Sequence, residues 1–148
     1  MSIALLHGAD ELRITPNQPA RILVIDDDVS VGVAIQTILA RRHCETVLAS
    51  RARAGIQMLH LSRFHVVMVD IFMPGLSGLN TIEYIRKKTQ VPIIAMSGFH
   101  LRNSAEAVDY LDMATQRGAS LCMRKPFQPS QLIDAVERSV GLWRSIEG

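Results

Sequence analysis

The stretch RILVIDDD, residues 21–28, decides the fold, because a short and mainly apolar run ends directly in three aspartates. Four later runs have the same apolar character, at residues 44–49, 66–69, 93–96 and 121–123. Most of these runs are continuously apolar and do not alternate with polar residues, which is typical of strands buried on both faces of a parallel sheet. The sequence therefore predicts a sheet that is covered on both sides.

Stretches with helical spacing separate these runs. The first has one apolar stripe at i, i+3, i+4, i+7 and i+8, formed by Val31, Ala34, Ile35, Ile38 and Leu39. Further patterns predict helices near residues 52–59 with Ser50 as a cap, 79–85 after Gly78, 101–111, and 132–143 with Pro129 in the first turn. Five strand-then-helix units predict a doubly wound α/β fold with a five-stranded parallel sheet, five helices and right-handed crossovers.

Length and composition restrict the class of protein. A chain of 148 residues is enough for one domain, and we expect a flexible leader at 1–20 followed by one domain at 21–148. Sixteen Lys and Arg against fourteen Asp and Glu give a net charge of only +2, so we expect no direct nucleic-acid partner. The arginines that flank the second run, at positions 41, 42, 51 and 53, are interpreted as a solvated face.

The cysteines and the apolar runs indicate the compartment. Cys44 and Cys122 have no metal-ligand spacing, and we interpret both as reduced, buried thiols. The chain has neither a signal-peptide pattern nor a run near the ~18 apolar residues that a membrane span needs. We therefore expect a cytoplasmic protein without a membrane partner.

Polar residues follow the predicted strands at the edge where parallel sheets bind ligands. Asp26, Asp27 and Asp28 come after the first strand and Asp70 after the third, and the fourth and fifth strands are followed by Ser97 and Lys125. Asp28 is equally well placed to cap the first helix.

Carboxylates gathered at this edge require a counter-charge. Two of them about 4 Å apart repel by about 4 kcal/mol at an effective dielectric constant of 20. A divalent cation relieves this repulsion, and oxygen ligands favour Mg²⁺ or Mn²⁺. With the Lys125 ammonium and the Ser97 hydroxyl nearby, the set predicts a site where a carboxylate accepts a phosphoryl group.

Four motifs at this edge resemble those of the receiver domain of two-component response regulators. They are VIDDD at 24–28, VD at 69–70 with MPG at 73–75 and Gly78, AMSG at 95–98, and GA at 118–119 with KPF at 125–127. Their order and spacing agree with the family over about residues 21–143. The resemblance implies a flavodoxin-like sheet with strand order 2-1-3-4-5.

The resemblance also implies a role for each residue of the site. Asp70 would be the phospho-acceptor, with Ser97 and Lys125 holding the phosphoryl group. The Mg²⁺ or Mn²⁺ ligands would be Asp70, Asp27, Asp26 acting through water, and the backbone carbonyl of Phe72. The family also tends to have a cis peptide after this lysine, here Lys125-Pro126.

The family resemblance further implies partners. The phosphoryl donor would be a phosphohistidine on a sensor histidine kinase or a histidine phosphotransfer protein. The chain would catalyse only its own phosphorylation and dephosphorylation. Because few residues follow the last predicted helix, we expect it to signal by protein contact, like single-domain regulators of the chemotaxis type. The kinase, the target, the oligomeric state and a possible longer parent protein are left open.

One position departs from the family pattern. Cys122 stands where many receivers carry a Tyr or Phe that moves inward with the hydroxyl residue, and a cysteine cannot act as an aromatic switch. Coupling from Ser97 must then use another group, for which Phe99 and Tyr110 are candidates.

Two alternatives belong to other functional classes. The pattern Asp26-x-Asp28-x-Ser30 resembles haloacid-dehalogenase-type phosphatases, in which Asp26 would be the nucleophile and Asp28 the general acid. That interpretation leaves Asp70 and the following Met73-Pro74 unexplained. The other alternative is a binding module with the same fold that is never phosphorylated.

Overall fold

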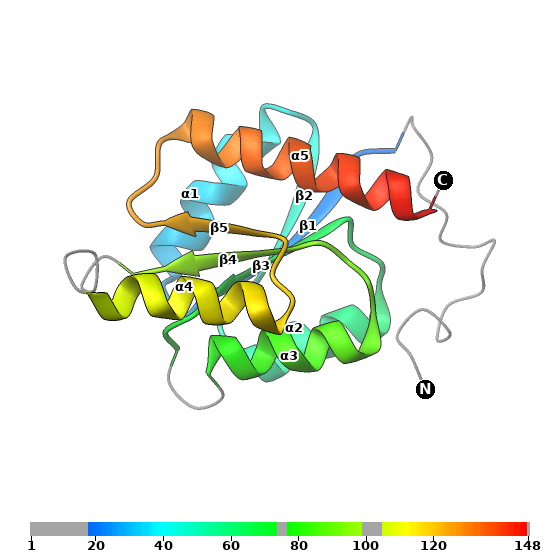
Figure 1. Ribbon diagram of the computed structural model, residues 1–148. Coiled ribbons are helices and arrows are strands. Elements are labelled where there is room, and N and C mark those ends of the chain that lie inside the picture. Colours follow the sequence, from blue (N-terminus) through cyan, green and yellow to red (C-terminus); the bar gives the residue numbers. More distant parts are fainter. Residues whose placement is uncertain (1–17, 74–76, 99–104, 148) are drawn as a thin grey trace.

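The computed structural model describes residues 18–73, 77–98 and 105–147, in which five strands alternate with five helices (Figure 1). The elements are β1 (Ala20–Ile25), α1 (Val29–Ala40), β2 (Cys44–Ala49), α2 (Ala52–Leu61), β3 (Val66–Asp70), α3 (Gly78–Lys88), β4 (Ile93–Ser97), α4 (Ala105–Arg117), β5 (Leu121–Arg124) and α5 (Pro129–Glu147). All strand pairs are parallel, and the order is β2-β1-β3-β4-β5. The predicted doubly wound sheet and its strand order are confirmed.

The sheet separates two apolar layers. Helices α1 and α5 cover one face, and α2, α3 and α4 cover the other (Figure 1). Alternate residues of β1 point to opposite faces of the sheet. Ile22 and Val24 pack in the layer with α1 and α5, whereas Leu23 and Ile25 pack in the layer with α2, α3 and α4. Every residue of β3 and of β4 is buried, which explains why all residues of these strands are apolar except the last ones, Asp70 and Ser97.

Helix starts agree with the sequence at some positions and differ at others. Asp28 caps α1 by accepting hydrogen bonds from the amides of Ser30 at 3.0 Å and Val31 at 3.4 Å. The prediction that Ser50 caps α2 is wrong, because the N-cap residue is Arg51 and its side chain makes no capping bond. Pro129 is the first residue of α5, as predicted.

The first strand begins one residue before the predicted apolar run. Strand β1 begins at Ala20, because this residue already pairs with Cys44 of β2. Residues 1–17 of the predicted leader lie outside the described residues.

A buried histidine joins β3 to the C-terminal part of α5. His65 is fully buried, its Nδ1 accepts the Arg21 amide at 2.8 Å, and its ring centroid lies 4.8 Å from that of Trp143. Burial, together with the positive charges of Arg144 and Arg21, lowers the pKa of His65 to about 4. His65 is therefore neutral in the folded protein at neutral pH.

Candidate functional site

The carboxyl ends of the central strands bring the predicted acidic residues together. Ile25 pairs with Val69, so Asp26 and Asp70 follow side by side on β1 and β3. Carboxylate oxygens of Asp26, Asp27 and Asp70 all lie within 4.8 Å of one another. Asp26 and Asp70 are each only 4% exposed, whereas Asp27 is exposed at the mouth of the cluster.

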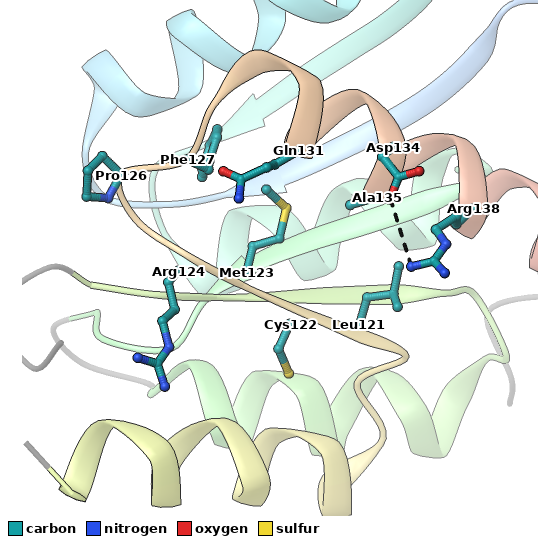
Figure 2. A pocket seen from close by; sticks show the side chains of 10 residues that line it. All are labelled: Leu121, Cys122, Met123, Arg124, Pro126, Phe127, Gln131, Asp134, Ala135 and Arg138. Atoms are coloured by element: carbon teal, nitrogen blue, oxygen red, sulfur yellow. Dashed lines mark ion pairs between the residues drawn. The ribbon is translucent and has the colours of Figure 1, made fainter.

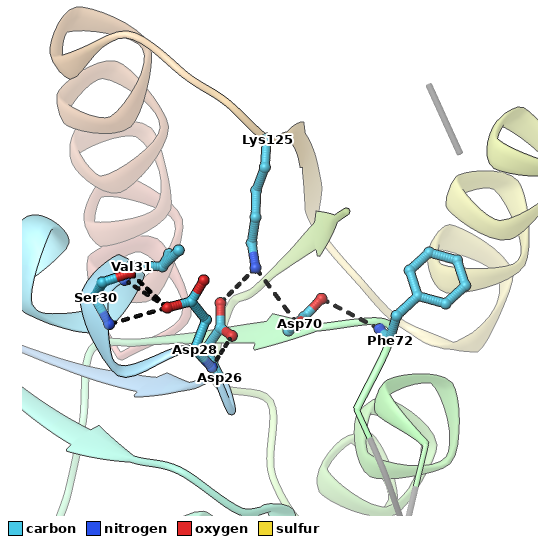
Figure 3. Close-up of polar contacts among 7 residues, drawn as sticks. All are labelled: Asp26, Asp28, Ser30, Val31, Asp70, Phe72 and Lys125. Carbon is cyan, nitrogen blue, oxygen red and sulfur yellow. Dashed lines mark hydrogen bonds and ion pairs between the residues drawn. The ribbon is translucent and has the colours of Figure 1, made fainter. Parts of the chain in front are cut away.

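Backbone amides orient the two buried carboxylates (Figure 3). The amide of Asp28 donates to Asp26 Oδ1 at 2.9 Å, and the amide of Phe72 donates to Asp70 Oδ1 at 3.2 Å. In each case the donor lies two residues beyond the carboxylate, in the turn that follows the strand. The backbone of each turn therefore sets the orientation of the carboxylate that precedes it.

Lys125 reaches the cluster from the residue after β5. Its Nζ lies 2.6 Å from Asp26 Oδ2 and 3.4 Å from Asp70 Oδ2 (Figure 3). The Lys125 amide donates to the carbonyl of Ser97 at 2.9 Å, and the peptide bond to Pro126 is cis, as expected. Ser97 is 2% exposed and comes directly after Met96, the residue that pairs with Asp70. All the predicted site residues therefore come to one edge of the sheet.

Burial and mutual charge shift the proton equilibria of this cluster. Burial raises the pKa of Asp70 to about 6, Lys125 opposes this shift, and Asp26 adds to it. For Lys125, burial alone would lower the pKa, but the hydrogen bond to Asp26 and the charges of Asp70 and Asp26 outweigh burial and raise it. One ammonium thus faces two buried carboxylates, those of Asp26 and Asp70.

The donor set fits a hard divalent cation. Three carboxylates with one lysine leave an excess of negative charge, and each carboxylate offers an oxygen within one small region. Such oxygen ligands are typical of Mg²⁺ and Mn²⁺. Phe72, whose carbonyl was predicted as a further ligand, follows Asp70 by two residues and is tied to it through its amide.

Two carboxylates of the cluster, those of Asp27 and Asp70, line a cleft of about 720 Å³. Asp27, Asp70 and Lys125 line its polar part, and Val31 and Phe127 belong to its apolar part. The apolar lining comes from α1, from Phe72 after β3 and from the residues just after Lys125, so a ligand at the carboxylates would lie near all three segments.

A second hollow, of about 420 Å³, lies between β5 and α5 and contains none of the three carboxylates (Figure 2). Cys122 points from β5 toward α4, with its Sγ 3.5 Å from Thr115 Oγ1 and 3.7 Å from the Leu111 carbonyl. This side chain therefore contacts α4 rather than the acidic cluster. The prediction that both cysteines are buried is wrong, because Cys122 is exposed and Cys44 is only half-buried. Of the two candidates to replace an aromatic residue here, Tyr110 is half-buried on α4, and Phe99 lies outside the described residues.

Sequence reasoning missed how closely α3 approaches the site. A Cβ placed on Gly78 would lie 2.0 Å from the Asp70 carbonyl oxygen and 2.5 Å from Ile71 Cα. Only glycine allows α3 to begin against the end of β3 in this way. The signal was present, since Gly78 stands at a predicted helix start, but the contact itself depends on the tertiary packing.

Asp28 is occupied as a helix cap. Its carboxylate accepts the Ser30 hydroxyl at 2.6 Å, a bond that lowers the pKa of Asp28. An ionised capping group is poorly suited to donate a proton, which is the role that the phosphatase alternative requires of Asp28.

Comparison with known proteins identifies the family. Residues 22–137 match the family model described as the response regulator receiver domain. The chain belongs to this family. Response regulators are the phospho-accepting partners in two-component systems, and receiver domains generally bind Mg²⁺ at an acidic cluster. The phosphatase alternative gains no support.

Several curated relatives are named as transcriptional regulatory proteins. The chain is 31% identical over 112 residues to the transcriptional regulatory protein YrkP of Bacillus subtilis, a match that spans 76% of this chain and 46% of the relative. It is 27% identical over 118 residues to a CpxR homolog of Haemophilus influenzae, spanning 80% of this chain and 49% of the relative. The chain thus spans about half the length of these relatives.

Solved structures share the fold. A response regulator receiver domain protein from Clostridium thermocellum has a TM-score of 0.76 at 27% identity, with 86% of this chain and 98% of that chain covered. NtrX from Brucella abortus has a TM-score of 0.79 at 27% identity, with 88% of this chain and 29% of that chain covered. Within the described residues, no helix is both long and apolar enough to span a membrane.

Proposed function

We propose that Asp70 is the residue that accepts the phosphoryl group. The observation that carries this proposal is the buried Asp70 carboxylate beside Asp26, with Lys125 Nζ 3.4 Å from its Oδ2. With a pKa of about 6, Asp70 is mainly ionised at pH 7 and can act as a nucleophile. Its oxygen attacks phosphorus, the P–N bond to the donor histidine breaks, and the imidazole leaves with the bonding electron pair.

The neighbouring groups then have complementary roles. Asp27, Asp70, the Phe72 carbonyl and, through water, Asp26 would hold Mg²⁺ or Mn²⁺, which supplies positive charge toward the phosphoryl oxygens. Lys125 is already within reach of Asp70 and would pair with a phosphoryl oxygen formed there. Ser97, buried at the same edge, would donate a hydrogen bond to another.

The proposed partners follow from this chemistry. The donor is a phosphohistidine on a sensor histidine kinase or a histidine phosphotransfer protein, and the phosphorylated domain signals by contact with another protein. We place it in the cytoplasm, without direct contact of this domain to nucleic acid or membrane. The chain would catalyse only its own phosphorylation and dephosphorylation.

Labelling with a small phosphodonor tests the proposal. The protein is incubated with acetyl phosphate and Mg²⁺, or with the beryllofluoride mimic, and the adduct is measured by mass spectrometry or ¹⁹F NMR. We expect one adduct per chain, its loss in Asp70→Asn, and its retention in Asp134→Asn, which alters an exposed carboxylate on α5.

Three outcomes would contradict the proposal. An undiminished adduct in Asp70→Asn would exclude this acceptor. Steady phosphate release that persists in Asp70→Asn and depends on Asp26 would favour the phosphatase. The absence of any response from the folded wild-type protein would favour a binding module.

A further inference from the structure

A pair of aromatic rings connects the candidate site to α4. The Phe72 ring packs against that of Tyr110, with centroids 4.9 Å apart and ring planes at 79°. This is the edge-to-face arrangement that aromatic side chains prefer. Phe72 belongs to the segment between β3 and α3, and Tyr110 to α4, so the contact joins parts of the chain 38 positions apart in sequence.

The backbone of Phe72 is tied to the same site. Its amide donates to Asp70 Oδ1 at 3.2 Å, while its ring points away from Asp70 (Figure 3). A residue held at both its amide and its ring has little freedom to rotate about φ and ψ. The ring contact therefore also restrains the directions of the Phe72 N–H and C=O groups.

The ring pair borders a hollow that leaves room for movement. Phe72 and Tyr110 line a cavity of about 480 Å³ together with Ile71, Met73, Ser77 and Leu79. Phe72 and Tyr110 are both only half-buried, so neither ring is enclosed by close packing on all sides. A small shift of α4 can thus be followed by both rings without creating a steric clash in the core.

We propose that Tyr110 is a positioning residue that holds Phe72 in the geometry needed for cation binding, and that it thereby couples α4 to the site. This inference rests on the proposed function, since it takes the Phe72 carbonyl as a cation ligand. Coupling between two sites is reciprocal, so a cation at the carboxylates must also affect the surroundings of Tyr110.

Titration with MgCl₂ followed by NMR tests the coupling in the unphosphorylated protein. Tyr110→Ala removes the ring contact, and we expect Mg²⁺ to bind about two- to tenfold more weakly, the range set by the energy of an aromatic pair. Tyr110→Phe keeps the ring and should restore the wild-type Kd. Tyr84→Ala is the matched control, because this partly exposed tyrosine on α3 packs near Lys88.

The tyrosine rings of the wild-type protein give a second readout that needs no destabilised variant. Addition of MgCl₂ should shift the ring resonances of Tyr110 and leave those of Tyr84 unchanged. In Phe72→Leu the Tyr110 shift should shrink, although Mg²⁺ still binds. If Tyr110→Ala does not fold, these ring resonances alone show whether the cation site and Tyr110 are coupled.

Failure of the coupling is distinguishable from failure of the proposed function. An unchanged Mg²⁺ affinity in Tyr110→Ala, or a Tyr110 ring that does not respond to Mg²⁺, would overturn the coupling while Asp70 still forms an adduct with acetyl phosphate. Absence of that adduct in the wild-type protein would instead overturn the function on which the coupling rests.

Discussion

Replacing Lys125 by methionine should strengthen cation binding, although it removes a residue of the site. Methionine keeps an unbranched side chain and deletes the charge that lies 2.6 Å from Asp26 and 3.4 Å from Asp70. At an effective dielectric constant of 20 these contacts correspond to attractions of about 6 and about 5 kcal/mol, much of which desolvation offsets. The lysine thus occupies the carboxylates that a cation would use.

The magnitude follows from charge repulsion. A charge of +2 about 5 Å from a charge of +1 is repelled by about 2 kcal/mol even at the dielectric constant of water. Removing the lysine charge should therefore tighten Mg²⁺ binding by about tenfold or more. Without Mg²⁺, the variant leaves two buried carboxylates without their cation and should lose about 3–5 kcal/mol of unfolding free energy.

Isothermal titration with MgCl₂ and thermal unfolding in chelator and in Mg²⁺ measure both effects. The experiment is best done at pH 8, because loss of the lysine charge raises the pKa of Asp70 further above about 6 and protons would otherwise compete. Lys87→Met is the control, since that lysine is 72% exposed on α3. Mg²⁺ binding by Lys125→Met that is equal to or weaker than that of the wild type would refute the idea that Lys125 and the cation compete for the same carboxylates.

Three further predictions concern stability. The pKa of His65 is about 4 in the folded protein and 6.5 in the unfolded chain, so neutral His65 contributes fully to the free energy of unfolding above pH 6.5. This contribution, at most about 3 kcal/mol, is lost as the pH falls toward 4. Chemical denaturation should therefore show a weaker pH dependence of stability in His65→Asn than in the wild type. Gly78→Ala should destabilise the protein by several kcal/mol, because the new Cβ would collide with the backbone of Asp70. Gly141→Ala on α5 has open space around the new Cβ and should raise the melting temperature, through a gain of about 0.5–1 kcal/mol in the free energy of unfolding. Asp28→Ala should lower the free energy of unfolding, because α1 loses its N-terminal cap, and the variant should still form the acetyl phosphate adduct on Asp70.

The arrangement of the acidic cluster could be predicted because it depends on strand direction and strand order. Parallel strands end at one edge, and the order that the family resemblance implies makes β1 and β3 neighbours, so Asp26 after β1 and Asp70 at the end of β3 lie side by side. The partner of Lys125 could not be predicted in the same way, because a long flexible side chain selects among several oxygens. Its shortest contact is with Asp26, not with Asp70.

Other misses reflect long-range geometry. The contact of Phe72 with Tyr110 depends on how α4 packs, and sequence spacing carries no information about it. The arginines flanking β2 are not one cluster, because Arg41 precedes this six-residue strand and Arg51 follows it, about 20 Å away at the usual rise of a strand. All four arginines are exposed, as expected for solvated residues, but they lie at the two ends of β2 and do not form a single face.

The neighbouring positions of Asp26 and Asp70 also bear on local unfolding. Both follow the central strands β1 and β3, which are paired on both sides, whereas Lys125 follows the edge strand β5. Edge elements open at lower free energy than the centre of a sheet. Partial opening of β5 should therefore release the lysine while the carboxylates stay in place. Hydrogen exchange would then show slower exchange in β1 and β3 than in β5, and the partly opened form would bind cations more tightly than the closed protein.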